Sequence, residues 1–509
     1  MQRSANRADR ATGHVVVIGG GIAGLAAAHR LLGTGLRVTL LEATDRLGGK
    51  LRTGEVAGVQ VDLGAESMLA RRPEGVGLAR AVGLGDRLRP PATATASLWT
   101  RDALRPMPKG HVMGVPGDPA ALGEVLSPEG LARIAQERDL TPTAVGDDVA
   151  VGAYVADRLG REVVDRLVEP LLGGVYAGDA YRISMRAAVP QLFELARRGG
   201  SLLDGVTRIQ EQAAARQQTG PVFQGIEGGI GTLPDAVAGA VRAGGGEILT
   251  ETPVLGLTRT ASGWDVRTDT RVIAADGIVL AAPAWSASTL LAAESPAASA
   301  ELAGVEYASM ALITMAFRRS DVTAAGTLDG RSGFLVPPVD GRTVKAATFS
   351  SQKWQWVADA APDLFLLRTS VGRYGEEDHL HREDAELVDV SLRDLAAATG
   401  LAAEPVATEV TRWIGGLPQY PVGHLGRVAR IREEVAKLPA LRVCGAVYDG
   451  VGIPACIASA HRAADEIVRD VAGESGAGTG DSGADTGKIA GEIIATPTLV
   501  QGTGSEAGQ

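Results

Sequence analysis

The first apolar run of the chain ends in a group of glycines. Residues 15–27 read VVVIGGGIAGLAA, in which four β-branched residues precede the glycines and a run of small residues. The unbroken apolar run predicts a buried strand over 15–18, and the residues after the glycines predict a helix over 23–32. A further apolar run predicts a second strand over 38–42. Together these elements predict a β-α-β unit, which is the start of a doubly wound α/β fold.

The spacing of apolar positions changes twice further along the chain. From about 120 to 216 it is helical, as in VADRLGREVVDRLVEPLL, and predicts a mostly helical region. Residues 305–372 contain the strand-like runs SMALITMAF, SGFLVPP, VKAATFS and LFLLRTSVG, which predict an antiparallel sheet. Between them, GGIGTLPDAVAGAVRAGGG predicts a helix with Thr232 as its N-cap and Gly244 at its end.

Composition narrows the class of protein. The 509 residues are 45% hydrophobic and 22% charged, which is the balance of a soluble globular protein. We find no apolar run of about 18 residues that predicts a membrane-spanning helix, and the polar first residues do not resemble a secretory signal. The expected location is therefore the cytoplasm. The net charge of −10 argues against nucleic acid as a partner, and an anionic substrate would need a local group of arginines.

Cysteine and histidine usage predicts no metal site. Cys444 and Cys456 are the two cysteines, which excludes a disulfide framework and a cysteine-rich zinc site. His379 and His381 form the one close histidine pair, and we interpret them as part of a solvated turn.

The glycines after the first strand have the spacing of a dinucleotide fingerprint. Gly19, Gly21 and Gly24 form G-x-G-x-x-G between a predicted strand and a predicted helix, the context that the motif requires. The first glycine allows the tight turn, the second lets a pyrophosphate approach, and the third lets helix and strand pack closely. The helix N-terminus favours negative charge, and Glu42 ends the second strand, where a carboxylate accepts ribose hydroxyls.

The residues after Glu42 favour FAD over NAD. Residues 43–50 read ATDRLGGK, where Arg46 and a second glycine pair suit the longer reach and the phosphates of FAD. The GGIGTLP stretch has proline where a third glycine would fall, so we find no second fingerprint for a nicotinamide. The hypothesis is an FAD protein that takes electrons directly from its substrate.

Several longer motifs resemble one family within the flavin amine oxidase superfamily. VVVIGGGIAGLAAAHRL, EATDRLGGKLRT, VDLGAESML, PMPKG, LVEPLLGGVYAGD and GAVYDGVGIPACI resemble the protoporphyrinogen and coproporphyrinogen oxidases of haem biosynthesis, over roughly residues 14–470. The motif set is most similar to Gram-positive members. The resemblance implies a six-electron oxidation of a porphyrinogen to a porphyrin in three flavin cycles, with O₂ as acceptor and three H₂O₂ as products.

The same resemblance implies an α/β, multi-domain architecture with three parts: a Rossmann-like FAD domain built from separated segments, an antiparallel-sheet substrate domain and a helical domain. The expected ranges are a disordered lead over 1–13, FAD-binding parts over 14–90, 217–300 and 405–471, a mostly helical domain over 91–216, a substrate-binding sheet over 301–404 and a disordered tail over 472–509. The tail is low in complexity and contains one apolar patch, IAGEIIATPTLV.

The resemblance also assigns candidate site residues. Those expected to bind the cofactor are Gly19, Gly20, Gly21, Ile22, Ala23, Gly24, Glu42, Ala43, Arg46, Gly49, Lys50, Gly64, Ala65, Glu66, Ser67, Met68, Val254, Trp413, Val451, Gly452 and Ile453. Residues 62–68 would line the isoalloxazine ring, Val254 would contact the adenine half, and Trp413 would lie beside the flavin. For Val254 and Trp413, ordinary roles in a strand and in the core stay open.

Substrate contacts are expected from cations and from the helical domain. Arg72 is the first candidate partner for a carboxylate, with Arg71 beside it, although arginines are mostly solvated. Tyr176 and Gly178 are expected to shape the substrate site. We assign no catalytic residue, because hydride loss from a methylene bridge needs positioning more than a dedicated acid or base, and the flavin performs the difficult step. Met310, Phe349 and Trp354 fit apolar walls but fit core positions better.

The substrate predicted first is coproporphyrinogen III, with four propionates, and protoporphyrinogen IX is the alternative. A different enzyme of the superfamily, such as an amine oxidase or a carotenoid desaturase, stays open, as does a non-catalytic binding module. The intact Gly19, Gly21, Gly24 and Glu42 set argues against the binding module. Transient contact with the next haem-pathway enzyme stays open, as does peripheral membrane contact, although the acidic charge disfavours anionic lipid.

Overall fold

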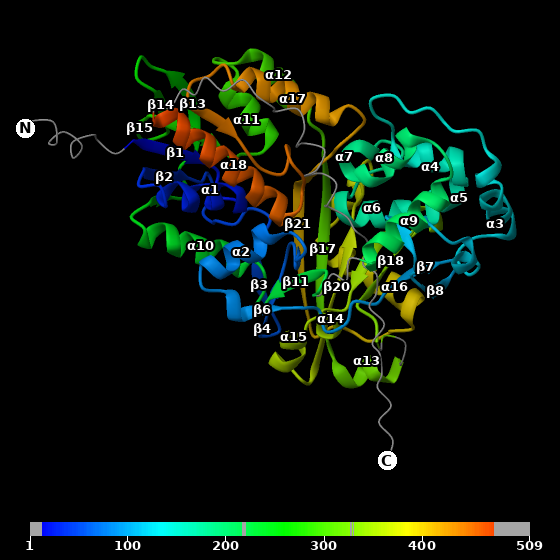
Figure 1. The fold of residues 1–509 in the computed structure, drawn as a ribbon. Helices are drawn as coiled ribbons and strands as arrows, with labels where there is room; N and C mark the ends of the chain where they lie inside the picture. Colours follow the sequence, from blue (N-terminus) through cyan, green and yellow to red (C-terminus); the bar gives the residue numbers. More distant parts are fainter. Residues whose placement is uncertain (1–12, 216–219, 326–327, 329, 473–509) are drawn as a thin grey trace, which may run out of the picture.

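The computed structural model describes residues 13–215, 220–325, 328 and 330–472. Figure 1 shows two lobes, with long strands running between them. The predicted disordered lead and tail fall almost entirely on residues 1–12 and 473–509, which lie outside the described residues.

A five-stranded parallel sheet forms the first lobe. Its order is β12 (Glu247–Leu249), β2 (Arg37–Leu41), β1 (His14–Ile18), β16 (Gly277–Leu280) and β22 (Leu441–Val443). One face packs against α1 (Ile22–Leu32), α2 (Pro73–Ala81), α10 (Thr232–Ala243) and α18 (Ile453–Val471), and the other against α11 (Ala284–Leu291), α12 (Pro296–Ala303) and α17 (His424–Val435). The predicted α/β class is confirmed. The predicted N-cap of α10 is wrong by one residue: Gly231 precedes the helix, and Thr232 is its first residue.

A seven-stranded sheet separates this lobe from the second one (Figure 1). Its order is β21 (Ala407–Pro418), β17 (Tyr307–Arg318), β20 (Leu364–Val371), β19 (Val344–Thr348), β18 (Gly333–Leu335), β7 (Ala96–Thr100) and β8 (Ala103–Pro106). All neighbours are antiparallel except β18 and β7, which are parallel. Between β17 and β21, the chain also forms the helices α13 (Arg319–Ala325), α14 (Ser350–Lys353), α15 (Gln355–Ala360) and α16 (Asp384–Thr399).

Two expected domain ranges differ from the sheet that forms. β7 and β8 lie within 91–216, which was expected to be mostly helical, and β21 lies within 405–471, which was expected to belong to the FAD-binding part. All three strands join the seven-stranded sheet instead. The physical reason is that β7 and β21 pair with distant segments, since Phe334 lies opposite Ser97 and Met310 opposite Trp413, and β8 joins the sheet through its neighbour β7. Local apolar spacing carries no information about such partners.

The second lobe is helical. It contains α3 (Pro128–Ala135), α4 (Val151–Leu159), α5 (Arg161–Val163), a π-helical turn (Val164–Val168), α6 (Glu169–Tyr176), α7 (Met185–Ala188), α8 (Pro190–Arg198) and α9 (Leu202–Ala215). A fully buried ion pair joins Arg158 Nη2 and Glu137 Oε1 at 2.6 Å. Ser201 Oγ and the Leu202 N–H also donate to Glu137, so this carboxylate fixes the loop before α9.

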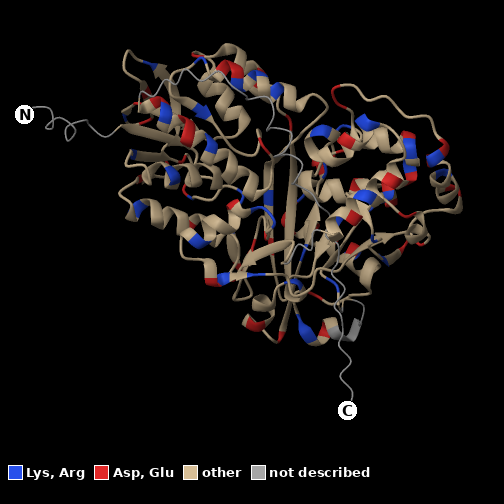
Figure 2. Ribbon diagram, in the orientation of Figure 1, with Lys and Arg blue, Asp and Glu red and all other residues tan. Residues whose placement is uncertain are grey.

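The remaining strands are short. They are β3 (Thr53–Val56), β4 (Val59–Asp62), β5 (Met68–Leu69), β6 (Leu88–Arg89), β9 (His111–Val112), β10 (Val115–Pro116), β11 (Phe223–Ile226), β13 (Val254–Arg259), β14 (Trp264–Thr268) and β15 (Val272–Ala275). Basic and acidic residues are interspersed over both lobes in the view of Figure 2. Among the described residues, none of the helices combines the length and the apolar character needed to cross a bilayer.

Candidate functional site

In the glycine loop after β1, Gly19 and Gly24 are closely packed, whereas Gly21 has free space beside it. Gly19 has φ +109°, and a Cβ on it would lie 2.6 Å from the Ala281 carbonyl oxygen. A Cβ on Gly24 would lie 1.9 Å from the Gly19 carbonyl oxygen. At Gly21, whose φ is −70°, a Cβ would meet nothing within 4 Å. Packing therefore requires Gly19 and Gly24, whereas Gly21 faces open space at the N-terminus of α1, where an anion is favoured.

Glu42 is held beside this loop. The Gly20 N–H donates to Glu42 Oε2 at 2.7 Å, and the Thr44 N–H and Oγ1 donate to Oε1 at 2.9 and 2.8 Å. The Thr252 N–H donates to the Glu42 carbonyl oxygen at 2.9 Å, which brings the start of β13 alongside. Val254 is partly exposed there. The residues just before β13 thus lie next to Glu42, and the contact of Val254 with a nucleotide stays a prediction.

The second glycine pair packs directly on the first. The Gly48 N–H donates to the Gly20 carbonyl oxygen at 2.9 Å, and a Cβ on Gly49 would lie 3.3 Å from Gly21 Cα. Arg46 Nη2 donates to the Gly49 carbonyl oxygen at 2.6 Å, and its guanidinium carbon lies 5.7 Å from the centroid of the Trp413 ring. The contact brings Trp413 of the seven-stranded sheet to the glycine loop of the parallel sheet.

Trp413 meets the loop at residues 63–68. Its Nε1 donates to the Leu63 carbonyl oxygen at 2.9 Å, and a Cβ on Gly64 would lie 3.1 Å from Trp413 Cζ2 and 2.3 Å from the Lys50 carbonyl oxygen. Lys50 is exposed, yet surrounding protein atoms partly desolvate its ammonium group and lower the pKa of that group. It has no hydrogen-bond or ion-pair partner among the described residues, so an anionic group would fit beside it.

Glu66 supports this loop through two cations. Its buried carboxylate forms ion pairs with Lys353 and with Arg368, whose Nη2 lies 3.1 Å from Oε2. Arg368 Nη1 also donates to the Gly64 carbonyl oxygen at 2.7 Å. Burial by itself would raise the pKa of Glu66, but Arg368 and Lys353 outweigh burial and lower it to about 2. The side chain of Glu66 thus ties the loop to β20 and α14, and the flavin contact expected of this residue stays a prediction.

The lowered pKa of Glu66 predicts a loss of stability in acid. A carboxyl group whose pKa is lowered by folding stabilises the folded state at every pH above the pKa that it has in the unfolded chain, here 4.5. This contribution is lost as the pH falls towards the folded-state pKa of about 2. We expect the difference in unfolding free energy between wild type and Glu66→Gln to shrink by about 3 kcal/mol over this interval. Denaturant unfolding of apoprotein at several pH values measures it. The exposed Glu55→Gln is the control, and a constant difference for Glu66→Gln would contradict the ion-pair assignment.

Asp62 and Asp449 anchor the loops on either side of the site. Asp62 accepts hydrogen bonds from the Ile230 and Gly231 N–H groups, both at 2.9 Å, so its carboxylate is held at the start of α10, and its expected place beside an isoalloxazine ring stays a prediction. Burial raises the pKa of Asp62 to about 7, although these two bonds oppose the rise. Asp449 accepts from Arg432 Nη2 and Ser459 Oγ, both at 2.6 Å, and fixes the loop before α18.

Arg71 and Arg72 keep buried polar atoms without partners. Arg72 is 6% exposed, and its Nη2 lies 2.9 Å from Glu74 Oε1. Among the described residues, Arg72 Nη1 and Arg71 Nε have no hydrogen-bond partner. Buried donors without partners are costly, so this is a place that a carboxylate or phosphate oxygen would fit.

The start of α18 packs beside these arginines. A Cβ on Gly75 would lie 2.7 Å from Met68 Sδ and 3.4 Å from Pro454 Cγ, so α2, the 63–68 loop and α18 meet here. Gly452 is the N-cap of α18, and Val451 is partly exposed. A helix N-terminus at this place favours negative charge on a bound group.

The side chain of Tyr176 is buried inside the helical lobe, and its expected part in shaping the substrate site stays a prediction. It is 1% exposed and packs on Tyr420 with the ring centroids 5.7 Å apart. A Cβ on Gly178 would lie 2.3 Å from Gln419 Oε1, which explains the glycine by packing. In α6, Gly173 and Gly174 are less enclosed: a Cβ on Gly173 meets nothing within 4 Å. Gly173 and Gly174 are therefore accessible at the surface of α6, whereas Tyr176 is buried.

One face of the seven-stranded sheet is left partly uncovered near Trp413. Cross-strand pairing and two-residue alternation place Met310, Leu335, Ala346, Ser370 and Arg368 on the same face as Trp413, and all are partly exposed. A Cβ on Gly174 of α6 would lie 3.8 Å from Leu335 Cδ2. Phe349 and Trp354 are 0% and 2% exposed, so their expected core positions are confirmed, whereas the core position expected of Met310 is wrong because this side chain is partly exposed on the uncovered face.

Comparison with known proteins agrees with this geometry. Residues 22–468 match the model of the flavin-containing amine oxidoreductases. The chain belongs to this family.

Known relatives align with nearly the whole length of this chain. The coproporphyrinogen III oxidase of Mycobacterium tuberculosis is 37% identical over 457 residues, covering 89% of this chain and 96% of the relative. The coproporphyrinogen III oxidase of Bacillus subtilis is 33% identical, and the alignment covers 87% of this chain and 95% of the relative. A crystal structure provisionally named protoporphyrinogen oxidase, from Exiguobacterium sp. 255-15, superposes with a TM-score of 0.79 at 33% identity, covering 90% and 99%. The resemblance drawn from the sequence motifs is confirmed.

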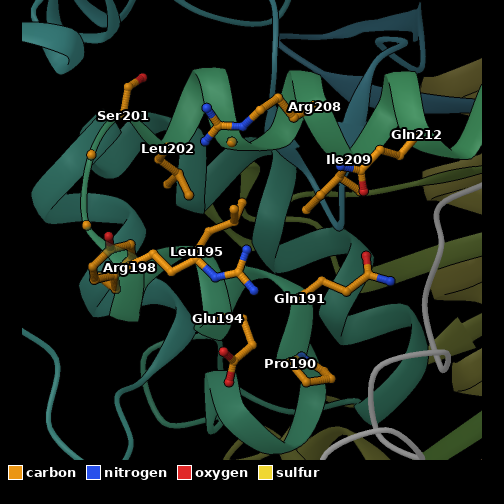
Figure 3. Close-up of a pocket in the computed structure, with 14 residues that line it drawn as sticks. Pro190, Gln191, Glu194, Leu195, Arg198, Ser201, Leu202, Arg208, Ile209 and Gln212 are labelled. Carbon is orange, nitrogen blue, oxygen red and sulfur yellow. The ribbon is translucent and has the colours of Figure 1, made fainter.

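A surface pocket of about 440 Å³ lies elsewhere, in the helical lobe of this flavin oxidoreductase. Figure 3 shows it between α8 and α9, with Arg198 and Arg208 on opposite sides of Leu195. None of the residues predicted to bind flavin or substrate lines it. We therefore do not assign it to the reaction.

Sequence reasoning missed the residues that hold the site together. Lys353, Arg368 and Asp449 were not predicted, although the glutamate of the AESML motif, if buried, was a signal that a cation must lie opposite. Which cation it would be could not be known, because Arg368 lies on a strand about 300 residues away in sequence.

Proposed function

We propose that this chain is an FAD-dependent oxidase that converts coproporphyrinogen III to coproporphyrin III, with O₂ as the electron acceptor. The observation that carries the proposal is the pair of arginines with unpartnered buried nitrogens next to the 63–68 loop. Near-full-length similarity to coproporphyrinogen III oxidases supports the same reading.

The residues present fit FAD along its whole length. Gly21, Gly49 and Arg46 would hold the pyrophosphate, Glu42 the ribose and Val254 the adenine half. Trp413, Lys50 and residues 64–68 would surround the ring system, and the N-terminus of α18 would favour negative charge on it. When bound, the flavin supplies the two-electron acceptor for hydride from a methylene bridge of the substrate.

The contribution of the protein is positioning. Met310, Leu335, Ala346 and Ser370 would form one wall for the macrocycle, and Arg71 and Arg72 would bind propionates. Hydride transfer needs the reacting atoms about 3–3.5 Å apart. No side chain is assigned as acid or base, since the pyrrole N–H of the oxidised ring loses its own proton to solvent. We propose that the enzyme works in the cytoplasm, with transient contact to the next enzyme of the haem pathway.

Aerobic turnover of the FAD-loaded protein tests the substrate. Coproporphyrinogen III and protoporphyrinogen IX are compared side by side, with porphyrin fluorescence followed above the non-enzymatic rate. We expect a clear preference for the substrate with four propionates. Equal rates would remove the preference for coproporphyrinogen III from the proposal, and reversed rates would favour protoporphyrinogen IX, in line with the oxidase name given to the Exiguobacterium structure. Turnover of neither would reject the proposal.

Arg72→Met is expected to weaken substrate binding. One charge-assisted hydrogen bond is worth about 1.5–3 kcal/mol, which corresponds to a rise in KM for coproporphyrinogen of about 10- to 100-fold. We expect a smaller change in kcat and an unchanged flavin content. Arg80→Met, on the exposed face of α2, the helix that follows Arg72, is the control. An unchanged KM for Arg72→Met would remove this residue from the substrate site.

A further inference from the structure

Two buried cations lie in a corner at the end of the uncovered sheet face. Lys345, on β19, donates from Nζ to the Gly372 carbonyl oxygen at 2.6 Å. Arg373, which follows Gly372 in the chain, donates from Nη2 to the Val336 carbonyl oxygen at 3.2 Å. The Val336 N–H in turn donates to the Lys345 carbonyl oxygen at 2.9 Å. Lys345 is 7% and Arg373 8% exposed, so both positive charges are enclosed by β18, β19 and the end of β20.

The negative charge around this corner does not balance the two cations. Glu376 lies 3.2 Å from Arg373 Nη1, but its side chain is 44% exposed. Lys345 has the Gly372 carbonyl oxygen as its one acceptor among the described residues. Burial and then Arg373 lower the pKa of Lys345 to about 7, with Glu376 opposing them. Glu169 of α6 also faces Arg373, but burial raises the pKa of Glu169 to about 7. A buried ammonium with one neutral acceptor is costly, and an anion beside it would offset the cost.

The corner adjoins the surface proposed for the macrocycle. Lys345 directly precedes Ala346, which lies on the uncovered face. A Cβ on Gly372 would lie 3.1 Å from Met310 Cα, and Met310 lies opposite Trp413. The Tyr374 N–H donates to the Ala177 carbonyl oxygen at 2.7 Å, which ties the corner to the end of α6. The two cations therefore lie where sheet face and helical lobe meet.

We propose that Lys345 and Arg373 form a second carboxylate subsite, which binds a propionate of the porphyrinogen and contributes to the preference for four propionates. This inference rests on the proposed function and deepens it. Arg71 and Arg72 bind propionates on one side of the substrate. Lys345 and Arg373 bind propionates that reach the corner beside α6. A substrate with two propionates cannot engage both subsites as fully, so the corner discriminates between the two porphyrinogens.

Lys345→Met tests the subsite and separates it from a structural role. If the lysine binds substrate, KM for coproporphyrinogen III and Kd for coproporphyrin III, measured by fluorescence quenching, rise about 10- to 100-fold. The thermal midpoint stays the same or rises, because an unbalanced buried charge is removed. KM for protoporphyrinogen IX should rise less. Lys345→Arg should retain most of the affinity, and the exposed Lys437→Met is the control.

Other outcomes overturn the inference in distinguishable ways. A lower thermal midpoint with unchanged Kd and KM would make Lys345 a structural residue. If Lys345→Met does not fold, Arg373→Gln is measured in its place, and an unchanged Kd for this variant would overturn the subsite. A wild-type enzyme that neither oxidises nor binds either tetrapyrrole would reject the proposed function and the subsite with it. An active wild type with unaffected variants would reject the subsite alone.

Discussion

Gly21→Val is expected to abolish flavin binding while the protein still folds. The backbone at Gly21 (φ −70°, ψ 174°) is extended, which valine adopts readily, and a Cβ there meets no protein atom within 4 Å. The fold therefore has room for the side chain. A pyrophosphate approaching the N-terminus of α1 does not, and we expect a loss of at least about 100-fold in flavin affinity, or about 2.7 kcal/mol.

The measurement is the flavin-to-protein absorbance ratio, with far-UV circular dichroism to check the fold. Gly239→Val is the matched control, because this helical glycine also has nothing within 4 Å of a Cβ. Gly24→Val should not fold, since its Cβ would lie 1.9 Å from the Gly19 carbonyl oxygen. A Gly21→Val protein with full flavin content would show that the cofactor lies elsewhere.

Arg368→Met is expected to cost about 3–5 kcal/mol of stability, since removing one partner of a buried ion pair leaves the other charge uncompensated. Arg368 is the cation that both pairs with Glu66 and donates to the Gly64 carbonyl oxygen. Its loss should also reduce flavin content, because the 63–68 loop loses its tie to β20. Denaturant unfolding of apoprotein measures the first effect, and absorbance the second.

The double variant Arg368→Met with Glu66→Leu separates the ion pair from general packing. Removing both charges should restore most of the lost stability, since Lys353 is 20% exposed and can be solvated. If Arg368→Met were as stable as wild type, or if the double variant were less stable than the single one, the ion pair would not be what holds the loop.

Local patterns in the sequence predicted the parts of the site that are local in the chain. The strand, the glycine loop and the helix of residues 14–32 follow from apolar spacing and glycine positions. The separate roles of Gly19, Gly21 and Gly24 follow from what the motif requires, and the close contacts agree with them. These features depend on neighbours within a few residues, so the sequence was sufficient.

The parts that could not be predicted depend on contacts between distant segments. β7 and β8 are short runs near a helical region, and they become strands of the sheet because β7 pairs with β18 and β8 pairs with β7. Tyr176 lies in a motif typical of the family, yet its contact with Tyr420 buries it in the helical lobe. The cations around Glu66 and the Lys345 corner come from strands of the second sheet, whose register is not readable from spacing.

Anaerobic mixing of the FAD-loaded enzyme with coproporphyrinogen III tests the central claim most directly, by following the flavin absorbance near 450 nm together with porphyrin fluorescence. If the chain is a porphyrinogen oxidase, the absorbance should fall with three enzyme flavins reduced for each coproporphyrin formed, and O₂ should restore it with release of H₂O₂. Flavin that stays oxidised with porphyrinogens but is reduced by a primary amine would contradict the account and return the chain to the amine-oxidising members of its family.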